Sequence, residues 1–246
     1  MSLADGRRVT VYMPAARRAR SRQRYPVLVL HDGQNLFEPD RAFVAGQHWR
    51  VGETADALIA ARRIPPIIIC GIDHTGPGRI REMTPTPGPD RTGGQAAKYA
   101  ALVVDDVLTL VRREFPASRE REQTGLGGSS LGGLVSLFAA ITYPAAFGRL
   151  MMMSPSVWWD RRVILDLVPR HPRAFAATRI WLDVGRKEGA RTVGDARRLA
   201  RALARLEMPP HLQYPVLEYL EDPAGTHSEA SWSARLAQAL VFLFGD

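Results

Sequence analysis

The feature that most constrains the fold is a glycine-rich stretch near the middle of the chain. Residues 125–133 read GLGGSSLGG, and their one complete G-x-S-x-G frame is centred on Ser130. A short strand pattern precedes this frame, and an apolar helical run at residues 134–140 follows it. On so tight a strand-to-helix turn the serine projects above the sheet, and the residues two before and two after it must be small because they pack together. We therefore predict that Ser130 is a nucleophile, rather than part of an ordinary glycine-rich turn.

The sequence on either side alternates between strand patterns and helical patterns. Strands are expected at residues 8–13, 25–30, 64–72, 147–154, 179–184 and 213–220, besides the one that leads into Ser130. Helices are expected at residues 51–62, 96–115, 191–206 and 231–244, besides the one that follows Ser130 to about residue 141. Residues 76–94 and 156–178 are expected to be irregular, and the second segment is the only candidate for a lid. The alternation predicts an α/β fold with a mostly parallel central sheet, helices on both faces, no large lid and a single domain over residues 1–246.

The net charge of +8 comes almost entirely from arginine. The densest basic run consists of Arg17, Arg18, Arg20, Arg22 and Arg24. A nucleic-acid site is one interpretation, but the run lacks interleaved aromatic residues and no nucleic-acid-binding motif accompanies it. We therefore expect a solvated loop between two strands and no nucleic-acid partner.

The rest of the composition is that of an ordinary globular protein. The apolar fraction of 46% is sufficient for a sizeable core, and the single cysteine, Cys70, lies in an apolar run where we expect it to be buried. No run of 18 apolar residues is present, so we expect no membrane span. Residues 1–8 lack the apolar core of a signal peptide, which predicts a cytoplasmic location unless a signal has been removed. The oligomeric state is left open.

A serine hydroxyl is a weak nucleophile at neutral pH, so a base must take its proton and a third group must orient that base. His227 is the candidate base because it follows the last predicted strand and precedes the final helix. α/β-Hydrolases carry their base there, since their residues follow the chain order serine, acid, histidine. The alternative role for His227 is to cap the final helix.

Two carboxylates near the end of the strand at residues 179–184 are candidates for the orienting group. Asp183 lies within the strand end, where pleating fixes the direction of its side chain, whereas Glu188 lies on the following loop and is free to reach His227. We favour Glu188 and keep Asp183 as the alternative acid. A surface charge beside Arg186 is the alternative role for Glu188.

The oxygen that becomes negative during acyl transfer needs fixed N–H donors, each worth about 3–4 kcal/mol. The residue after the nucleophile, Leu131, supplies one donor, and Gln34 or a neighbour in the loop after residues 25–30 supplies the other. Gly33 is expected to leave room for the substrate carbonyl. The sequence has no H-x-x-x-H or C-x-x-C spacing, so we expect no metal ion and no cofactor.

Several motifs together resemble the putative-esterase family, which includes esterase D, enterochelin esterases, feruloyl esterases and mycolyl transferases. The motifs are LHDGQNLF at 30–37, GID at 71–73, REMTP at 81–85, the glycines of 127–133, SPSVWW at 154–159 and GTHSEASW at 225–232. They look most like the enterochelin-esterase-like branch. The resemblance implies the α/β-hydrolase fold, a catalytic triad of Ser130, Glu188 and His227, and an oxyanion hole formed by the N–H groups of Gln34 and Leu131. The family often has aspartate where Glu188 stands.

The resemblance also implies a serine esterase that forms an acyl-enzyme and acts on small, aromatic or siderophore-like esters. The candidate substrate-binding residues are Asp32, Arg81, Trp158 and Trp159. In the siderophore branch an arginine near the site holds catecholate anions, a role that either Arg79 or Arg81 could fill here. The two tryptophans either form a wall of the acyl pocket or belong to the core.

Two other functions remain open at this point, and the expected partner in each case is a small molecule. An acyltransferase would use the same triad but exclude water, so added alcohols would compete with hydrolysis. A non-catalytic binding protein on the same scaffold would not be labelled at Ser130 by a fluorophosphonate.

Overall fold

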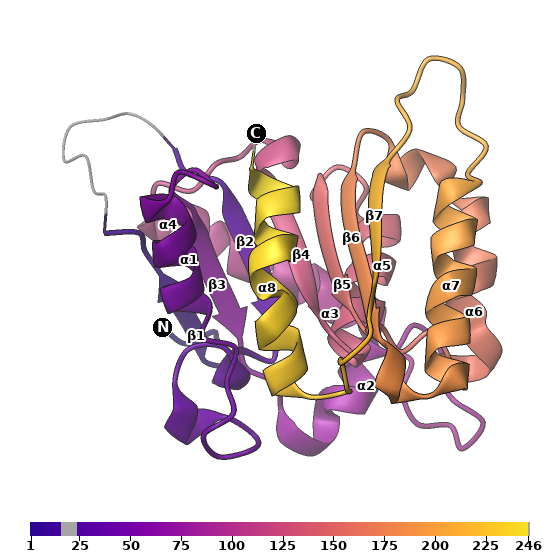
Figure 1. Cartoon of the computed structure of the whole chain (residues 1–246), viewed down its shortest axis with the longest axis horizontal. Helices are drawn as coiled ribbons and strands as arrows, with labels where there is room; N and C mark the ends of the chain where they lie inside the picture. The colour runs from indigo at the N-terminus through magenta and orange to yellow at the C-terminus, as the bar shows by residue number, and fades with distance from the viewer. Residues whose placement is uncertain (16–23, 246) are drawn as a thin grey trace.

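The computed structural model describes residues 1–15 and 24–245. In that part of the chain the strands form one seven-stranded sheet in the order β1-β3-β2-β4-β5-β6-β7 (Figure 1). The strands are β1 (Val9–Tyr12), β2 (Val27–His31), β3 (Ile68–Ile72), β4 (Thr124–Ser129), β5 (Arg149–Met153), β6 (Arg179–Gly185) and β7 (Val216–Asp222). The edge strand β1 runs antiparallel to β3, and every other neighbouring pair is parallel. The predicted α/β class with a mostly parallel sheet is confirmed.

Helices cover both faces of this sheet. They are α1 (Val51–Ala60), α2 (Arg79–Met83), α3 (Ala96–Ala101), α4 (Thr109–Glu114), α5 (Leu131–Thr142), α6 (Trp159–Arg170), α7 (Ala190–Ala204) and α8 (Glu229–Phe244). A π-helical segment, Leu102–Leu108, joins α3 to α4, so the helix predicted at residues 96–115 is nearly continuous. Helices α1 and α8 pack on one face of the sheet, and α3 to α7 pack on the other (Figure 1).

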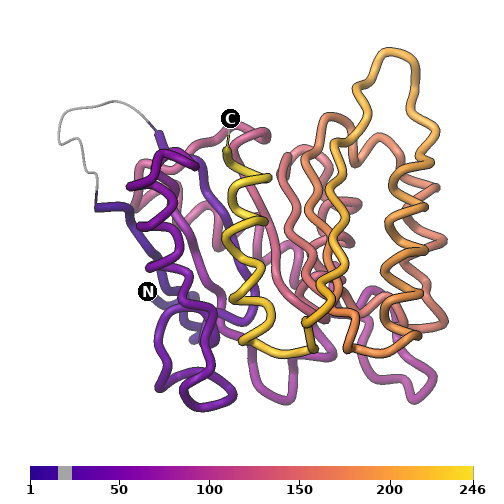
Figure 2. The backbone as a smooth tube through the Cα atoms, in the orientation of Figure 1, coloured from indigo at the N-terminus to yellow at the C-terminus, as the bar shows by residue number. Residues whose placement is uncertain are grey.

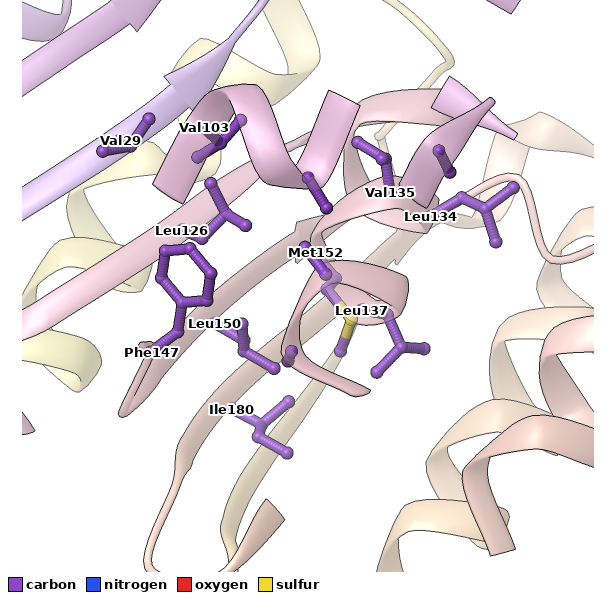
Figure 3. Packing of buried hydrophobic residues seen from close by; sticks show 14 of the residues in the cluster. Val29, Val103, Leu126, Leu134, Val135, Leu137, Phe147, Leu150, Met152 and Ile180 are labelled. Carbon is purple, nitrogen blue, oxygen red and sulfur yellow. The ribbon is translucent and has the colours of Figure 1, made fainter. Parts of the chain in front are cut away.

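The three consecutive methionines of β5 show how the two layers are filled. Successive side chains of a strand point to opposite faces. Met151 and Met153 accordingly contact the layer of α1 and α8, whereas Met152 packs in the other layer, and all three are fully buried. Figure 3 shows Met152 with Leu126 and Phe147 in that second layer. The methionines are therefore core residues, as expected from their position in an apolar strand.

The two segments that were expected to be irregular contain helices. Residues 76–94 include α2, and residues 156–178 include α6. The pattern of α6 is difficult to recognise because three charged residues with non-helical φ and ψ, Asp160, Arg161 and Arg162, fill its first turn and Pro169 lies near its end. Its fully buried residues Ile164 and Val168 are four apart, and packing against α7 selects the helix. Residues 156–178 therefore do not form a lid.

Other expectations concern single residues and the chain as a whole. Cys70 is fully buried in β3, as predicted. Of the arginine run, residues 17, 18, 20 and 22 lie outside the described residues, while the guanidinium of Arg24 donates to the carbonyl of Ala117 at 3.0 Å. None of the helices described in residues 1–15 and 24–245 has the length and apolar character needed to cross a bilayer.

The carboxyl ends of the parallel strands lie at one edge of the sheet, the lower edge in Figure 2. Each strand is followed there by a polar residue of interest. Gln34 follows β2, Ser130 follows β4, Ser154 follows β5, Glu188 follows β6 and His227 follows β7. Parallel winding thus gathers residues from five distant parts of the sequence, as is usual for functional sites in such sheets.

Candidate active site

Ser130 occupies a strained turn between β4 and α5. Its φ of 56° and ψ of −120° lie in a region that non-glycine residues rarely adopt, at a cost of about 1–3 kcal/mol. The turn is possible because Gly128 and Gly132 meet across it: a Cβ atom on Gly128 would lie only 3.2 Å from the Cα of Gly132. This is the close packing on which the prediction of a nucleophile turn was based.

The exit of β5 holds this strained turn in place. The N–H of Ser130 donates to the carbonyl of Met153, and the carbonyl of Ser130 accepts from the N–H of Ser156, both at 2.9 Å. The Ser130 and Ser156 hydroxyls are 3.1 Å apart and form a hydrogen bond. The backbone of β5 therefore keeps the serine in its projecting conformation.

Of the two proposed oxyanion donors, Leu131 directly follows Ser130, and Gln34 follows β2, the strand next to β4. Leu131 is the first residue of α5, so its N–H has no acceptor within the helix. Gln34 lies in a 3₁₀ turn, Gly33–Asn35, directly after β2, and its side-chain oxygen accepts from the N–H of His74 at 3.3 Å. The expected role of Gly33 is different in the structure: a Cβ there would lie 2.7 Å from the carbonyl carbon of Gly71, so the glycine makes room for β3.

Glu188 and His227 are joined by a hydrogen bond. The carboxylate Oε2 of Glu188 accepts from Nδ1 of His227 at 2.7 Å, with the Glu188 side chain 1% exposed and the His227 side chain 44% exposed. The other oxygen of Glu188 accepts from the hydroxyl of Ser154 at 2.5 Å and from the N–H of Gly185 at 2.8 Å. Burial acts to raise the pKa of Glu188, but these hydrogen bonds outweigh it and lower the pKa below its ordinary value.

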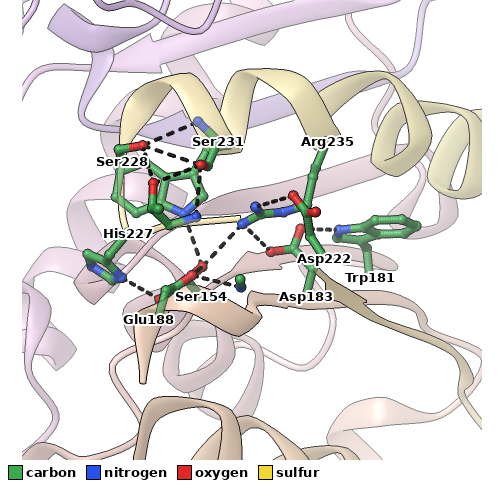
Figure 4. A network of polar contacts seen from close by, with 12 residues as sticks. Ser154, Trp181, Asp183, Glu188, Asp222, His227, Ser228, Ser231 and Arg235 are labelled. Atoms are coloured by element: carbon green, nitrogen blue, oxygen red, sulfur yellow. Dashed lines mark hydrogen bonds and ion pairs between the residues drawn. The ribbon is translucent and has the colours of Figure 1, made fainter. Parts of the chain in front are cut away.

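Asp183, the alternative acid, lies in the same polar network as Glu188 but is not bonded to His227 (Figure 4). Its carboxylate is fully buried and accepts from Nη2 of Arg235 at 2.9 Å and from Nε1 of Trp181 at 2.7 Å. The same nitrogen of Arg235 also donates to the hydroxyl of Ser154 at 3.2 Å. Asp183 therefore fixes Arg235, and Arg235 in turn contacts Ser154, which donates to Glu188. The carboxylate that contacts the imidazole is that of Glu188.

Ser130 and His227 line one cavity of about 760 Å³ at the carboxyl edge of the sheet. The remaining lining residues are Asp32, Asn35, Phe43, Val44, Gln47, His74, Gly76, Pro77, Arg79, Ile80, Ser129, Ser228, Glu229 and Trp232. Of the predicted substrate-binding residues, only Asp32 is among them. The Trp232 ring lies edge-on to the ring of His227, with their centroids 4.9 Å apart.

Three predicted substrate-binding residues lie outside this cavity. Trp158 is 46% exposed and lines a separate hollow with Arg191. Trp159 is buried, and its Nε1 donates to the carbonyl of Thr86 at 2.9 Å, so it belongs to the core. Arg81 is exposed on α2, and it is Arg79, two residues earlier, that lines the cavity. The direction of these side chains depends on α2 and α6, which the sequence pattern does not reveal.

The chain matches a known protein family over nearly its whole length. The model of the family described as "Putative esterase" matches residues 1–243. The chain belongs to the putative esterase family. The membership confirms the resemblance drawn from the motifs, including the enterochelin-esterase-like relatives.

Relatives of this esterase-family chain include both short and long proteins. An uncharacterized protein of Bacillus subtilis, YbbA, is 26% identical over 196 residues, which cover 76% of this chain and 70% of that protein. The iron(III) enterobactin esterase of Escherichia coli K12 is 26% identical over 253 residues, which cover 98% of this chain but 54% of that protein. The chain thus spans about half the length of that enterobactin esterase.

Solved structures support the fold of this family member. The BES protein of Bacillus cereus superposes with a TM-score of 0.79 at 21% identity, covering 100% of this chain and 93% of that one. The enterobactin esterase FES of Shigella flexneri, solved in the presence of enterobactin, gives a TM-score of 0.71 at 22% identity, covering 96% and 55%. At these identities the similarity establishes the fold alone, which is of the α/β-hydrolase type.

Several residues that build the site of this esterase-family protein were missed as individuals, although they lie in or near the recognised motifs. Asn35 lies in the LHDGQNLF motif, Ser154 and Ser156 in SPSVWW, and Trp232 at the end of GTHSEASW, with Arg235 three residues further along α8. Their roles depend on which strand ends are neighbours, and motif positions alone do not give that information. Within residues 1–15 and 24–245, no group of three or more His, Cys, Asp or Glu residues is arranged to hold a metal ion.

His31 lies directly behind the nucleophile turn and is only 2% exposed. Its Nδ1 is 2.9 Å from the Tyr99 hydroxyl and its Nε2 is 3.1 Å from the Ser136 hydroxyl, so it links β2 to α3 and α5. A Cβ on Gly132 would lie 3.3 Å from the Cβ of His31, which shows how tightly the turn rests on it. Burial lowers the pKa of His31 from 6.5 to about 4.

This low pKa predicts a loss of stability in acid. The unfolded chain takes up a proton on His31 more readily than the folded chain does, so protonation favours unfolding. The contribution of neutral His31 to the free energy of unfolding is therefore complete above pH 6.5 and is lost as the pH falls toward 4. Between pH 7.5 and 5 the loss is about 2 kcal/mol. Urea unfolding at the two pH values should show that the difference in free energy of unfolding between the wild type and His31→Gln decreases by that amount. The exposed-histidine variant His171→Gln is the control, and an unchanged difference for His31→Gln would contradict the assignment.

Proposed function

We propose that the protein is a single-domain serine hydrolase that cleaves small carboxylic esters through an acyl-enzyme. The observation that carries the proposal is the 2.7 Å hydrogen bond from His227 to the buried Glu188, together with the projecting Ser130 that lines the same cavity as His227. A bond from Nδ1 to a carboxylate fixes the tautomer of the imidazole and leaves Nε2 as an acceptor. That nitrogen is the base for the Ser130 hydroxyl.

In the first half of the reaction, the Ser130 oxygen attacks the carbonyl carbon of the ester and His227 takes the hydroxyl proton. The electron pair of the carbonyl moves to its oxygen, which the N–H groups of Leu131 and Gln34 stabilise. The tetrahedral intermediate collapses, the bond to the alcohol breaks, and His227 returns the proton to the departing alcohol. Glu188 orients the ring and stabilises its charged form throughout.

In the second half, water replaces the alcohol. His227 takes a proton from the water molecule, whose oxygen attacks the acyl carbon. Collapse of this second intermediate breaks the bond to Ser130, returns the proton to its oxygen and releases the carboxylic acid. The Ser130 hydroxyl is hydrogen-bonded to Ser156 in the substrate-free protein. Catalytic hydrogen bonds are often completed only when the substrate is bound.

The exposure of His227 favours hydrolysis over acyl transfer. Its side chain is 44% exposed at the rim of the cavity, so water reaches the base directly. An acyltransferase needs to keep water away from the acyl-enzyme. Relatives named as siderophore esterases support an ester substrate. The enterobactin esterase among them is about twice as long as this chain, so its own substrate is not transferred here.

A fluorophosphonate probe tests this proposal at its first step. The activated serine should attack the phosphorus and displace fluoride, leaving a stable adduct on Ser130 that peptide mass spectrometry locates. A denatured sample and a sample treated first with a serine-esterase inhibitor are the controls, and both should remain unlabelled. Labelling of another residue, or none at all, would favour a binding protein on this scaffold.

A further inference from the structure

Exposed apolar side chains gather at the mouth of the candidate active site. The large hydrophobic residues that the structure shows as exposed are Met1, Phe43, Val44, Ile80, Trp158, Tyr214 and Val216. Phe43, Val44 and Ile80 all line the cavity that contains Ser130, with exposures of 79%, 39% and 47%. We call these three residues the apolar lip. A cluster of exposed apolar side chains around a concave site indicates a surface that a ligand covers.

The apolar lip is tied to the reaction centre by Asn35. The Asn35 side-chain oxygen accepts from the N–H of Phe43 at 2.8 Å, and its side-chain nitrogen donates to Oε1 of Glu229 at 3.2 Å. Asn35 itself belongs to the 3₁₀ turn that carries Gln34. One side chain therefore joins the Phe43 loop, the start of α8 and the proposed oxyanion loop, so the Phe43 part of the lip is anchored to the turn that carries Gln34.

The charged residues of the cavity leave no net positive charge. Arg79 makes a double ion pair with Asp32, with both nitrogen–oxygen distances 2.7 Å, so their charges cancel. Glu229 is the second carboxylate of the lining, and no ion pair joins it to any arginine or lysine in the part of the chain that the structure describes. With histidines counted as neutral, one cation faces two carboxylates among the described lining residues, a net charge of −1.

We infer that the ester bound here is uncharged, that an aliphatic or aromatic group of it covers the apolar lip, and that the cavity disfavours anionic esters. This inference rests on the proposed function and gives it a substrate class. An apolar group that covers Phe43, Val44 and Ile80 removes apolar surface from water, which is favourable. An added carboxylate instead meets the charge of Glu229 and finds the guanidinium of Arg79 already neutralised by Asp32. The overall positive charge of the protein does not alter this local balance, because salt screens distant surface charges.

Two matched pairs of esters test the effect of charge. The first pair is p-nitrophenyl hexanoate and the p-nitrophenyl monoester of adipic acid, which carries a carboxylate in place of the terminal methyl group. The second pair is pentyl acetate and 5-acetoxypentanoate, which places the same change in the alcohol. After subtraction of uncatalysed hydrolysis, kcat/KM of the neutral ester should exceed that of the anionic ester by about fivefold or more in both pairs at about 0.1 M salt, which screens the distant surface charges. A smaller ratio in either pair overturns the inference.

A charge placed on the apolar lip tests the location. Ile80→Lys adds a cation to the rim and should reduce the neutral-to-anionic ratio about fivefold or more in at least one pair. Val216→Lys is the matched control: Val216 is also aliphatic and 54% exposed, but it lies at the start of β7, at the opposite edge of the sheet, and its variant should keep the wild-type ratio. An unchanged ratio in Ile80→Lys overturns the assignment of the lip. If Ser130→Ala hydrolyses these esters at wild-type rates, the proposed function fails instead.

Discussion

Ser130→Ala is expected to lower kcat for p-nitrophenyl acetate by about 10⁴- to 10⁶-fold, because removal of the nucleophile from a serine triad leaves only binding and oxyanion stabilisation. The protein should remain folded, since the alanine keeps both backbone hydrogen bonds that hold the turn, to Met153 and from Ser156. Stopped-flow and steady-state assays measure the first effect, and thermal unfolding measures the second.

The neighbouring serine provides the control for this prediction. Ser129 is the last residue of β4 and is 6% exposed, and it would be the nucleophile only in the incomplete motif frame. Ser129→Ala should therefore retain activity within about tenfold of the wild type. Equal losses in the two variants, or full activity in Ser130→Ala, would show that the motif frame was assigned wrongly.

Glu188→Gln should lower kcat by about 10³- to 10⁴-fold without unfolding the protein. The carboxylate of Glu188 accepts hydrogen bonds from three donors, on His227, Ser154 and Gly185. An amide must turn its NH₂ group either toward His227 or toward both Ser154 and Gly185. When it faces His227, the ring is forced into the tautomer with the proton on Nε2, which cannot accept a proton from Ser130. The charge that stabilises the imidazolium is lost in either orientation.

Asp183→Asn should have the opposite pattern of effects. Asp183 and Arg235 are both buried, and breaking such a pair costs about 3–5 kcal/mol of stability, because Arg235 is left with only its longer 3.3 Å ion pair to Asp222. The folded fraction should keep kcat within about tenfold, since Asp183 does not contact His227. Denaturant unfolding and kcat, measured together on both variants, distinguish the two carboxylates. A large loss of kcat in Asp183→Asn with normal activity in Glu188→Gln would identify Asp183 as the acid.

The buried network behind Glu188 explains why the choice between these carboxylates was open in the sequence. Asp183 lies at the end of the predicted strand and Glu188 lies five residues later, and either side chain is long enough to reach a nearby histidine. The deciding contact comes from Arg235, which lies about fifty residues away on α8 and occupies Asp183. Only the packing of α8 over β5 and β6 brings that guanidinium to the strand end.

The same distinction applies to the substrate side of the site. The loop residues Phe43 and Val44 and the helix residue Ile80 show no regular apolar pattern in the sequence, so the apolar lip could not be predicted. Trp158 and Trp159 are predicted to bind substrate because large aromatic rings near a motif often form pockets. In the structure Trp158 lies at the start of α6 and is exposed, whereas Trp159, its first residue, is buried in the core. Composition near a motif does not give the direction of a side chain.

The sequence alone determined the features that depend on local spacing: the tight glycine turn around Ser130, the alternation of strands and helices, and the order serine, acid, histidine along the chain. These follow from steric limits and hydrophobic periodicity, which act over a few residues at a time. The tertiary structure decided which carboxylate meets His227, that Arg79 is neutralised by Asp32, and which apolar side chains surround the cavity. Those features depend on which strand ends become neighbours, and that is set by packing between segments far apart in the chain.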